Sequence, residues 1–423
     1  IETNLTATSN IGMGANAVNS ITTGDFNVGL GDEAGTALTS GNSNTGIGWS
    51  ALATATTGSN NTSLGEAALR YLTTASSNTG IGAASLSNTT TGANNTAVGY
   101  QSLYVNTTGA KNTAIGERAL TANTTASNNT ALGREALKAN TTGASNTAVG
   151  LQSLLANTTG GNNTGIGLQS LISNTTASYN TAVGVYSGDA LTTGAGNTIL
   201  GYGALSSSVT GASNIAIGDS AMGTGVVTGD YNVAVGTSSL LVNTSGANNT
   251  AVGRDTLKAN TTASRNTAIG TDSLTTNTTG GDNTAIGWSA GKLNVTGTKL
   301  TAVGFQAFFN STVSENTGLG SSAGYRTTTG SANTAIGSDA FFNNTSGGSN
   351  TTVGQQSMLT NTTGSNNVAL GVNALLANTT ASNNTAVGKN ALLANTTGSQ
   401  NVALGTSGLA ANTTGTNNVA VGY

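Results

Sequence analysis

The sequence contains no cysteine, no histidine and no proline, and only 6% of its residues are charged. Without cysteine no disulfide framework can form. Without histidine and cysteine, the Ser-His-Asp and Cys-His nucleophile systems and the usual zinc sites are excluded. An ordinary globular domain has about 25% charged residues, and a disordered segment usually has high charge or much proline. The chain is therefore typical of neither class.

The charge that is present excludes two kinds of partner. The formal net charge is −3, and no basic stripe offers a site for nucleic acid or for an anionic membrane surface. No run approaches the ~18 apolar residues of a membrane span. We expect no nucleic-acid partner, no membrane insertion, no metal and no cofactor.

The sequence is built from a 17-residue repeat. Asn-Thr-Ala-Val-Gly recurs along the chain, and its glycine returns at Gly99, Gly116, Gly133 and Gly150 and onward in both directions. Numbered from the Asn, the consensus is N-T-A-V-G-x-x-A-L-x-A-N-T-T-G-x-N. Residues 1–423 are predicted to form one continuous β-solenoid, a parallel β-roll of about 25 coils. Irregular coils are expected near 219–236 and 305–320, where the step is 18 and 16 residues.

Each coil is predicted to contain two short strands and two turns. Positions 2 and 4 are Thr, Val, Ile or Leu around a small position 3, an alternation typical of a strand. Position 9 is usually Leu beside a position 10 that accepts lysine or arginine, so position 9 is expected to point inward. The glycines at positions 5 and 15 are expected at the reversals, because glycine takes positive φ without penalty. The predicted turn glycines are Gly99, Gly116, Gly133 and Gly150.

Stacking places each residue above its counterpart in the next coil. The predicted core ladder has one column from position 4 and one from position 9: Val98, Ile115, Leu132, Val149, and Leu103, Leu120, Leu137, Leu154. Glu117-Arg118 is followed one coil later by Arg134-Glu135, so both stacked pairs are opposite in sign. Exposed pairs of this kind add only about 0.2–1 kcal/mol each.

Small residues at positions 3 and 8 suggest a face that packs on another copy of the chain. We expect a homotrimer, copies stacked head to tail, or both, since the repeat continues to the first and last coils. At the irregular coils, around Met222–Val227 and Phe308–Val313, we expect bulges. These are either binding loops or drift of the repeat.

The repeat N-N-T-A-V-G, with variants such as Asn214-Ile-Ala-Ile-Gly218, resembles the N-S-V-A-I-G repeat of YadA-like trimeric autotransporter adhesin heads. The resemblance extends to nearly every coil and implies a left-handed parallel β-roll, association of three chains, and attachment to extracellular matrix or cell surfaces. The array is also similar to the shafts of bacteriophage tail fibres and bacterial surface fibres.

Few residues are candidates for a specific site. Asp32-Glu33 is the only adjacent acidic pair, and neighbours along a strand point to opposite faces, so a solvated surface is favoured over an acid/base site. Asn-x-Thr triplets match the glycosylation pattern, although turn and ladder chemistry explains them too; the examples are Asn106, Asn140 and Asn157. Aromatic residues at positions 6 and 10 are candidates for contact with a glycan or a host-surface protein, or pack over a neighbouring coil: Trp49, Tyr100, Tyr104, Trp288, Phe305, Phe309 and Phe342.

The function expected from these features is a structural or adhesive fibre shaft, extracellular or on a cell surface, with no enzymatic activity. A bacteriophage tail-fibre shaft, located on the virion, is one alternative. An ice-binding solenoid is the other, because threonines recur at positions 13 and 14, although adjacent residues do not share a strand face.

Overall fold

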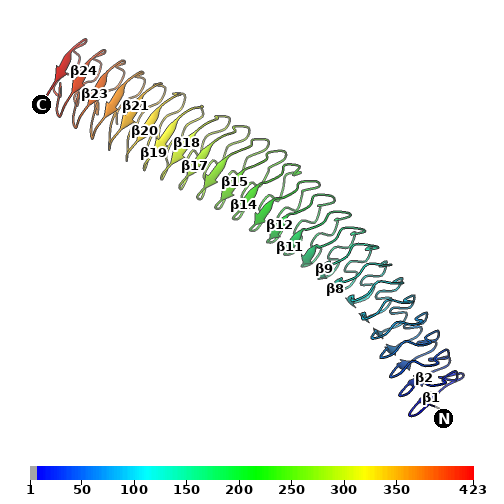
Figure 1. Cartoon of the computed structure of the whole chain (residues 1–423). Helices are drawn as coiled ribbons and strands as arrows, with labels where there is room; N and C mark the ends of the chain where they lie inside the picture. The colour runs from blue at the N-terminus through cyan, green and yellow to red at the C-terminus, as the bar shows by residue number, and fades with distance from the viewer. Residues whose placement is uncertain (1–6) are drawn as a thin grey trace. The chain divides into compact units, whose positions relative to one another are not determined.

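The computed structural model describes residues 7–423. Contacts divide the chain into two compact units, one ending at Ser213 and the other beginning at Asn214. Within each unit the chain winds into stacked coils, one per repeat, with a short strand on one side and turns around the rest (Figure 1). No helix occurs among the described residues. The predicted all-β solenoid is confirmed.

Every strand is three residues long. The strands of the first unit, from residue 7 onward, are β1 (Ile11–Met13), β2 (Val28–Leu30), β3 (Thr45–Ile47), β4 (Thr62–Leu64), β5 (Thr79–Ile81), β6 (Thr96–Val98), β7 (Thr113–Ile115), β8 (Thr130–Leu132), β9 (Thr147–Val149), β10 (Thr164–Ile166), β11 (Thr181–Val183) and β12 (Thr198–Leu200).

The strands of the second unit are β13 (Ile215–Ile217), β14 (Val233–Val235), β15 (Thr250–Val252), β16 (Thr267–Ile269), β17 (Thr284–Ile286), β18 (Thr301–Val303), β19 (Thr317–Leu319), β20 (Thr334–Ile336), β21 (Thr351–Val353), β22 (Val368–Leu370), β23 (Thr385–Val387), β24 (Val402–Leu404) and β25 (Val419–Val421).

Successive strands pair in parallel with like residues side by side. In β6 and β7, Thr96 pairs with Thr113 and Val98 pairs with Ile115, and β7 continues in the same register to β8. The main chain between the strands bonds from coil to coil as well, as in Leu120 N to Ala136 O at 3.0 Å. The 17-residue step therefore sets the register of nearly the whole backbone of each unit.

The prediction of two strands per coil is wrong, because the described coils have one. The segment that contains position 9 is a series of turns in which positions 7 and 9 take left-handed conformations, as in Arg118 (φ 57°) and Leu120 (φ 51°). An alternation of left-handed residues cannot extend as a strand, although its N–H groups still bond to the next coil. The motif glycine at position 5 does have the expected positive φ, +133° at Gly116. The positive φ expected at position 15 is wrong, since φ there, as at Gly143, lies outside the left-handed region, although the chain does bend directly before it, at Thr141 and Thr142.

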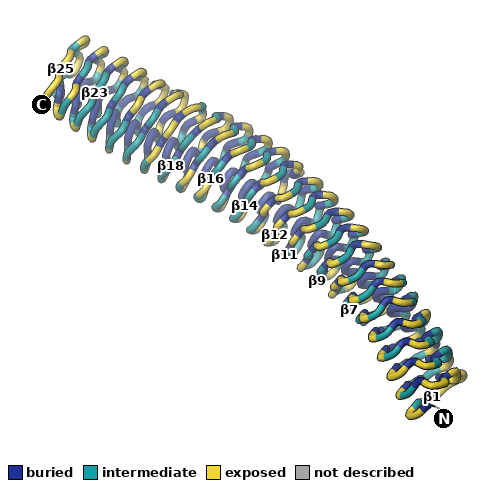
Figure 2. Tube along the Cα trace, viewed as in Figure 1, coloured by how far each residue is buried: buried dark blue, intermediate teal, exposed yellow. Residues whose placement is uncertain are grey.

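In each strand the small central residue, at position 3, points into the interior of the coil. Ala97, Ala114 and Ala131 at position 3 are fully buried. The leucines predicted at position 9 are also fully buried: Leu103, Leu120, Leu137 and Leu154. Figure 2 shows this alternation of buried and exposed segments in each coil.

The inward orientation predicted for position 4 is wrong. Val98 and Val149 are half-buried, and Ile115 and Leu132 are 37% and 44% exposed. They form one column, as expected, but on the outer face. The physical reason is space: a Cβ added at Gly46, at position 3, would lie 3.6 Å from Leu52 Cδ1 at position 9. The side chain at position 9 fills the coil, so a small residue stands opposite it; the large Ile199 is buried where Gly188 occupies position 9 of the preceding coil and leaves the space free.

Positions 3 and 8 therefore do not form the intermolecular face inferred from their small size. Ala114 and Ala119 are both fully buried inside their own coil. Packing within one chain requires small residues at these positions, so their size is no evidence for a trimer.

Two columns of buried asparagine complete the interior. At position 1, Asn112 Nδ2 donates to Asn95 Oδ1 of the preceding coil at 3.1 Å and to Ala126 O across its own coil at 2.9 Å. At position 12, Asn123 Nδ2 donates to Asn106 Oδ1 at 2.9 Å and to the same Ala126 O at 3.0 Å. Buried amides are stable only when they are paired, and like-on-like stacking supplies the partners.

The irregular coils do not contain the predicted bulges in their strands. Ile215 pairs with Val233 across the 18-residue step, and Thr301 pairs with Thr317 across the 16-residue step. The extra residue lies in the turn around Gly225–Val227, where the position-12 asparagine is missing. The turn around Val313 is one residue shorter.

Large and small side chains compensate one another elsewhere in the second unit. Gly324 stands where leucine is expected, and the Phe308 ring fills the space that a Cβ at Gly324 would need, with Phe308 Cζ at 2.6 Å from that point. Phe308 itself is fully buried. The interior is thus packed across neighbouring coils.

Candidate functional site

The most extensive surface feature is an aliphatic stripe, which we define as the outward position-4 side chains. In the first unit it runs from Met13 and Leu30 to Leu200, and in the second from Ile217 to Val421. Its members include Ile47, Leu64, Ile81, Val98, Ile115, Leu132, Val149, Ile166 and Val183 in the first unit. Several are about two-fifths exposed. Position 2, mostly threonine, borders the stripe on the same strand face.

Neighbouring members of the stripe lie about 4.8 Å apart, the normal distance between strands. Their backbone is paired on both sides within the unit, so the stripe is a rigid surface and not a loop. A row of Val, Ile and Leu that is exposed or half-buried from coil to coil is unusual, since soluble monomers rarely expose long contiguous apolar patches. Sequence reasoning missed this surface because it assigned position 4 to the core.

The acidic pair does not form a carboxylate dyad. Asp32 Oδ1 accepts a hydrogen bond from Ala15 N at 2.9 Å, and Glu33 Oε2 accepts one from Ser50 Oγ at 2.7 Å. Each carboxylate therefore contacts a different neighbouring coil. Among residues 7–423, no group of three or more acidic, histidine or cysteine side chains is placed to hold a metal ion.

The candidate glycosylation residues Asn106, Asn140 and Asn157 are fully buried members of the position-12 column. Asn140 Nδ2, the atom that would carry the sugar, donates to Asn123 Oδ1 and to Gly143 O, both at 3.0 Å. A glycan on this nitrogen would break both bonds and would have no space. The glycosylation hypothesis is wrong for the folded chain, and the ladder explanation of these triplets holds.

The aromatic candidates divide into two kinds. Trp288 stacks on Phe305 with centroids 5.1 Å apart, and Tyr325 stacks between Phe309 and Phe342 at 5.3 and 5.1 Å. These rings stack on one another from coil to coil, so they pack over neighbouring coils, although Trp288 and Phe305 remain 45% and 50% exposed.

The first-unit aromatics differ. In the part of the chain that the structure describes, no aromatic ring stacks on Trp49, Tyr100 or Tyr104. Trp49 and Tyr100 are 47% and 48% exposed, about as much as Trp288 and Phe305, and Tyr104 is half-buried. Trp49 lies beside the guanidinium of Arg70, at 5.2 Å from ring centroid to Cζ. This ring contacts a charged group and remains open to a ligand.

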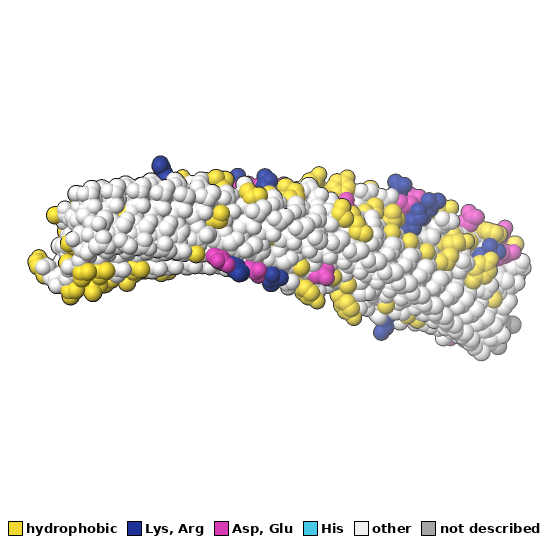
Figure 3. All heavy atoms as spheres, turned by 90° about the horizontal axis from the view of Figure 1, so that it is seen from above, with side chains coloured by type: hydrophobic (Ala, Val, Ile, Leu, Met, Phe, Trp, Pro, Cys, Tyr) yellow, Lys and Arg dark blue, Asp and Glu magenta, His cyan; other side chains and the backbone are white. Residues whose placement is uncertain are grey.

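Charged side chains form small isolated groups. Figure 3 shows one face on which uncharged atoms predominate and charges lie in a few clusters. The expected pair of Arg134 with Glu117 is present at 3.8 Å. Glu135 pairs instead with Lys138 at 2.8 Å, and the hydrogen bonds from Gln152 and then Lys138 lower the pKa of Glu135 to about 2.

Comparison with protein-family models and with curated proteins finds no match to this chain. No helix among the described residues is long and apolar enough to cross a membrane. The candidate sites therefore have to be interpreted from their own geometry.

Proposed function

We propose that this protein is a structural, adhesive fibre shaft of an extracellular or cell-surface assembly, and that copies of the chain associate side by side along the aliphatic stripe. The observation that carries this proposal is the unbroken row of outward Val, Ile and Leu in each unit. The resemblance to trimeric adhesin heads supports three as the number of chains.

The area of the stripe is sufficient for association. A burial free energy of ~1.5–3 kcal/mol at ~25 cal/mol per Å² corresponds to about 100 Å² for a fully exposed aliphatic side chain. Six of the twelve first-unit members are 37–60% exposed and the others are less exposed, so twelve such side chains offer at most roughly 500 Å². With the bordering threonines, each unit approaches the ~800 Å² per partner of a standard interface.

The test is the sedimentation velocity of the intact chain. Replacing Ile115 and Leu132 by lysine puts two charges in the stripe without changing the interior, and we expect the assembly to dissociate to monomers. The matched control places lysine at Thr125 and Thr142, which are exposed in the same coils but lie away from the stripe. A wild-type chain that sediments as a stable monomer at micromolar concentration would refute the proposal.

A bacteriophage tail-fibre shaft would use the same rigid stack and the same lateral packing. Immunogold labelling with antibodies raised against this chain distinguishes the two locations. Label on cell surfaces supports the first, and label on virions supports the second.

Ice binding is a second candidate with an observation in its favour. Thr96 and Val98 point outward together, and this pair repeats at strand spacing, as a flat array for ordered water would require. Positions 13 and 14 serve less well, because the position-13 hydroxyls donate to the next coil, as in Thr124 Oγ1 to Thr141 O. Position 4 varies among Val, Ile and Leu, which is more compatible with packing against another protein than with a match to the regular lattice of ice. Absence of thermal hysteresis at millimolar concentration would exclude the candidate.

A further inference from the structure

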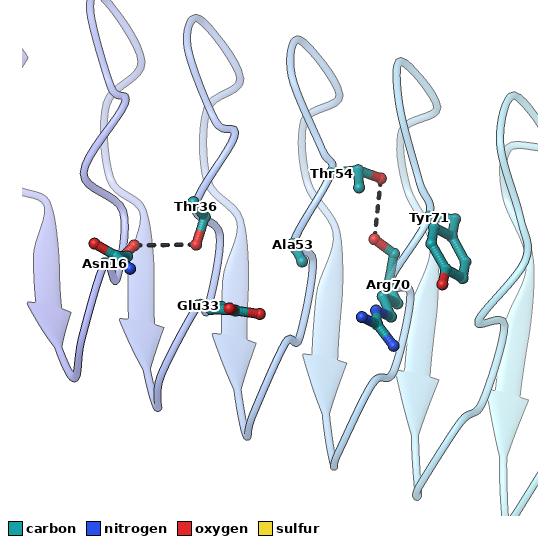
Figure 4. Close-up of a pocket in the computed structure, with 7 residues that line it drawn as sticks. All are labelled: Asn16, Glu33, Thr36, Ala53, Thr54, Arg70 and Tyr71. Carbon is teal, nitrogen blue, oxygen red and sulfur yellow. Dashed lines mark hydrogen bonds between the residues drawn. The ribbon is translucent and has the colours of Figure 1, made fainter.

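A notch opens on the outside of the first unit where a small residue interrupts a column of larger ones. Position 10 is Thr36, Ala53 and Arg70 in three successive coils. Ala53 leaves a cavity of about 270 Å³, which is also lined by Asn16, Glu33, Thr54 and Tyr71. Figure 4 shows Ala53 at the centre, with Glu33 on one side and Arg70 and Tyr71 on the other. The notch lies on positions 7, 10 and 11, and not on the aliphatic stripe.

The guanidinium of Arg70 is held in place but not paired. Its Cζ lies 5.2 Å from the ring centroids of both Trp49 and Tyr71. Among the ion pairs of residues 7–423 none uses Arg70, and its main-chain carbonyl, rather than its side chain, takes the bond from Thr54 Oγ1. An arginine positioned by aromatic rings presents its N–H groups in a fixed fork that matches a carboxylate.

The opposite wall offers acceptors for hydroxyl groups. Glu33 is exposed, and its Oε2 accepts from Ser50 while Oε1 also remains able to accept. Thr36 Oγ1 donates its proton to Asn16 O at 3.1 Å, so its oxygen can act only as an acceptor toward a ligand. The exposed rings of Trp49 and Tyr71, 47% and 44% accessible, supply apolar edges beside the notch.

We propose that this notch binds an acidic glycan. The carboxylate of a uronic or sialic acid unit pairs with Arg70, its hydroxyls donate to Glu33 and Thr36, and its ring packs beside Tyr71. The volume lies just below the ~300–1,000 Å³ of pockets that enclose drug-sized ligands, so it holds one sugar of a chain that continues over the surface. The inference rests on the proposed adhesive function, for which it names the ligand.

The test is titration calorimetry of the intact protein with trigalacturonic acid and with 3′-sialyllactose. The fully methyl-esterified trigalacturonate is the matched ligand without the charge. We expect at least one acid to bind, and the ester to bind roughly tenfold or more weakly, as for loss of a charge-assisted hydrogen bond. Arg70→Ala should weaken binding to the same degree.

Ala53→Leu fills the notch and keeps every charge. Leucine already occupies position 10 at Leu155, Leu376 and Leu393, so the variant is compatible with the fold, and we expect it to abolish binding. Arg118→Ala removes an arginine outside the notch and should bind as the wild type does. Melting temperatures establish that the variants are folded.

Three results would overturn the inference: neither acid binds, the ester binds as well as the acid, or Arg70→Ala leaves affinity unchanged. Binding of an acidic peptide in place of both glycans would also overturn it, in favour of a protein partner. Sedimentation separates this outcome from failure of the fibre proposal, because Arg70 lies off the stripe and its removal should leave association intact.

Discussion

The buried asparagine column at position 12 leads to a quantitative prediction at Asn140. Its Nδ2 donates to Asn123 Oδ1 and Gly143 O, and its Oδ1 accepts from Asn157 Nδ2 at 2.8 Å. Asn140→Ala removes three hydrogen bonds of ~1 kcal/mol each and leaves Asn123 Oδ1 buried without its donor, at a further ~1–3 kcal/mol. We expect a loss of about 4–6 kcal/mol.

Asn140→Leu should reduce the free energy of unfolding less than Asn140→Ala does. Leu72 and Leu191 occupy position 12 in their own coils and are fully buried there, so the space accepts leucine. Burial of the new side chain returns roughly 2 kcal/mol. The coil before Leu191 shows the residual cost, since Asn174 Oδ1 has no partner there. We therefore expect Asn140→Leu to be about 2 kcal/mol more stable than Asn140→Ala.

Hydrogen exchange measured by mass spectrometry is the suitable assay, because stability in a coil stack is local. Faster exchange should appear in peptides covering residues 123–160 and should be absent from peptides of the second unit. Thr142→Ala, at an exposed site in the same turn, is the control and should exchange as the wild type does. Equal exchange in all three variants, or a loss spread evenly through the chain, would refute the ladder argument.

Two further substitutions test the backbone and the charges. Gly116→Ala should destabilise by several kcal/mol or prevent folding, because φ is +133° and the new Cβ would meet Gly133 O. Gly143→Ala is the comparison by thermal melting: its new Cβ would also meet a main-chain oxygen, that of Gly160, but φ lies outside the left-handed region and Ala126 and Ala177 occupy the same position in other coils, so we expect a smaller loss. Burial raises the pKa of Asp189, whose Oδ1 lacks a partner. The folded state therefore binds the proton more tightly than the unfolded state does, and the free energy of unfolding falls as the pH rises from the ordinary pKa of an aspartate to the raised pKa of the folded state. Asp189→Asn should therefore raise the melting temperature at pH 7 and not at pH 3, and an equal gain at both values would contradict this.

Much of the architecture was predictable because the length of the repeat determines which residues stack on one another. The 17-residue step predicts that Val98, Ile115 and Leu132 form one column, and they do. The motif glycine predicts a positive φ at Gly116, and an inward position 9 predicts a buried Leu120. Each of these follows from a local preference repeated once per coil.

The candidate sites were less predictable. Trp49 was recognised as an exposed aromatic from its position in the repeat, but its contact with Arg70 depends on side chains one coil apart. The notch itself arises from the size of Ala53 relative to Thr36 and Arg70. No motif records such a difference in size between stacked residues.

The sequence by itself determined the coil length, the parallel register and the columns of like residues, because a fixed spacing allows only one way to place each residue over its counterpart. The sequence also indicated that position 9 points inward, but only the tertiary structure decided that position 4 faces outward and that the asparagines at positions 1 and 12 face inward. The interior of a coil is narrow, the leucine at position 9 fills it, and the asparagines enter because each amide is paired across the coil and with its neighbour. The more hydrophobic position 4 is thereby left outside, where it forms the surface on which the proposed function depends.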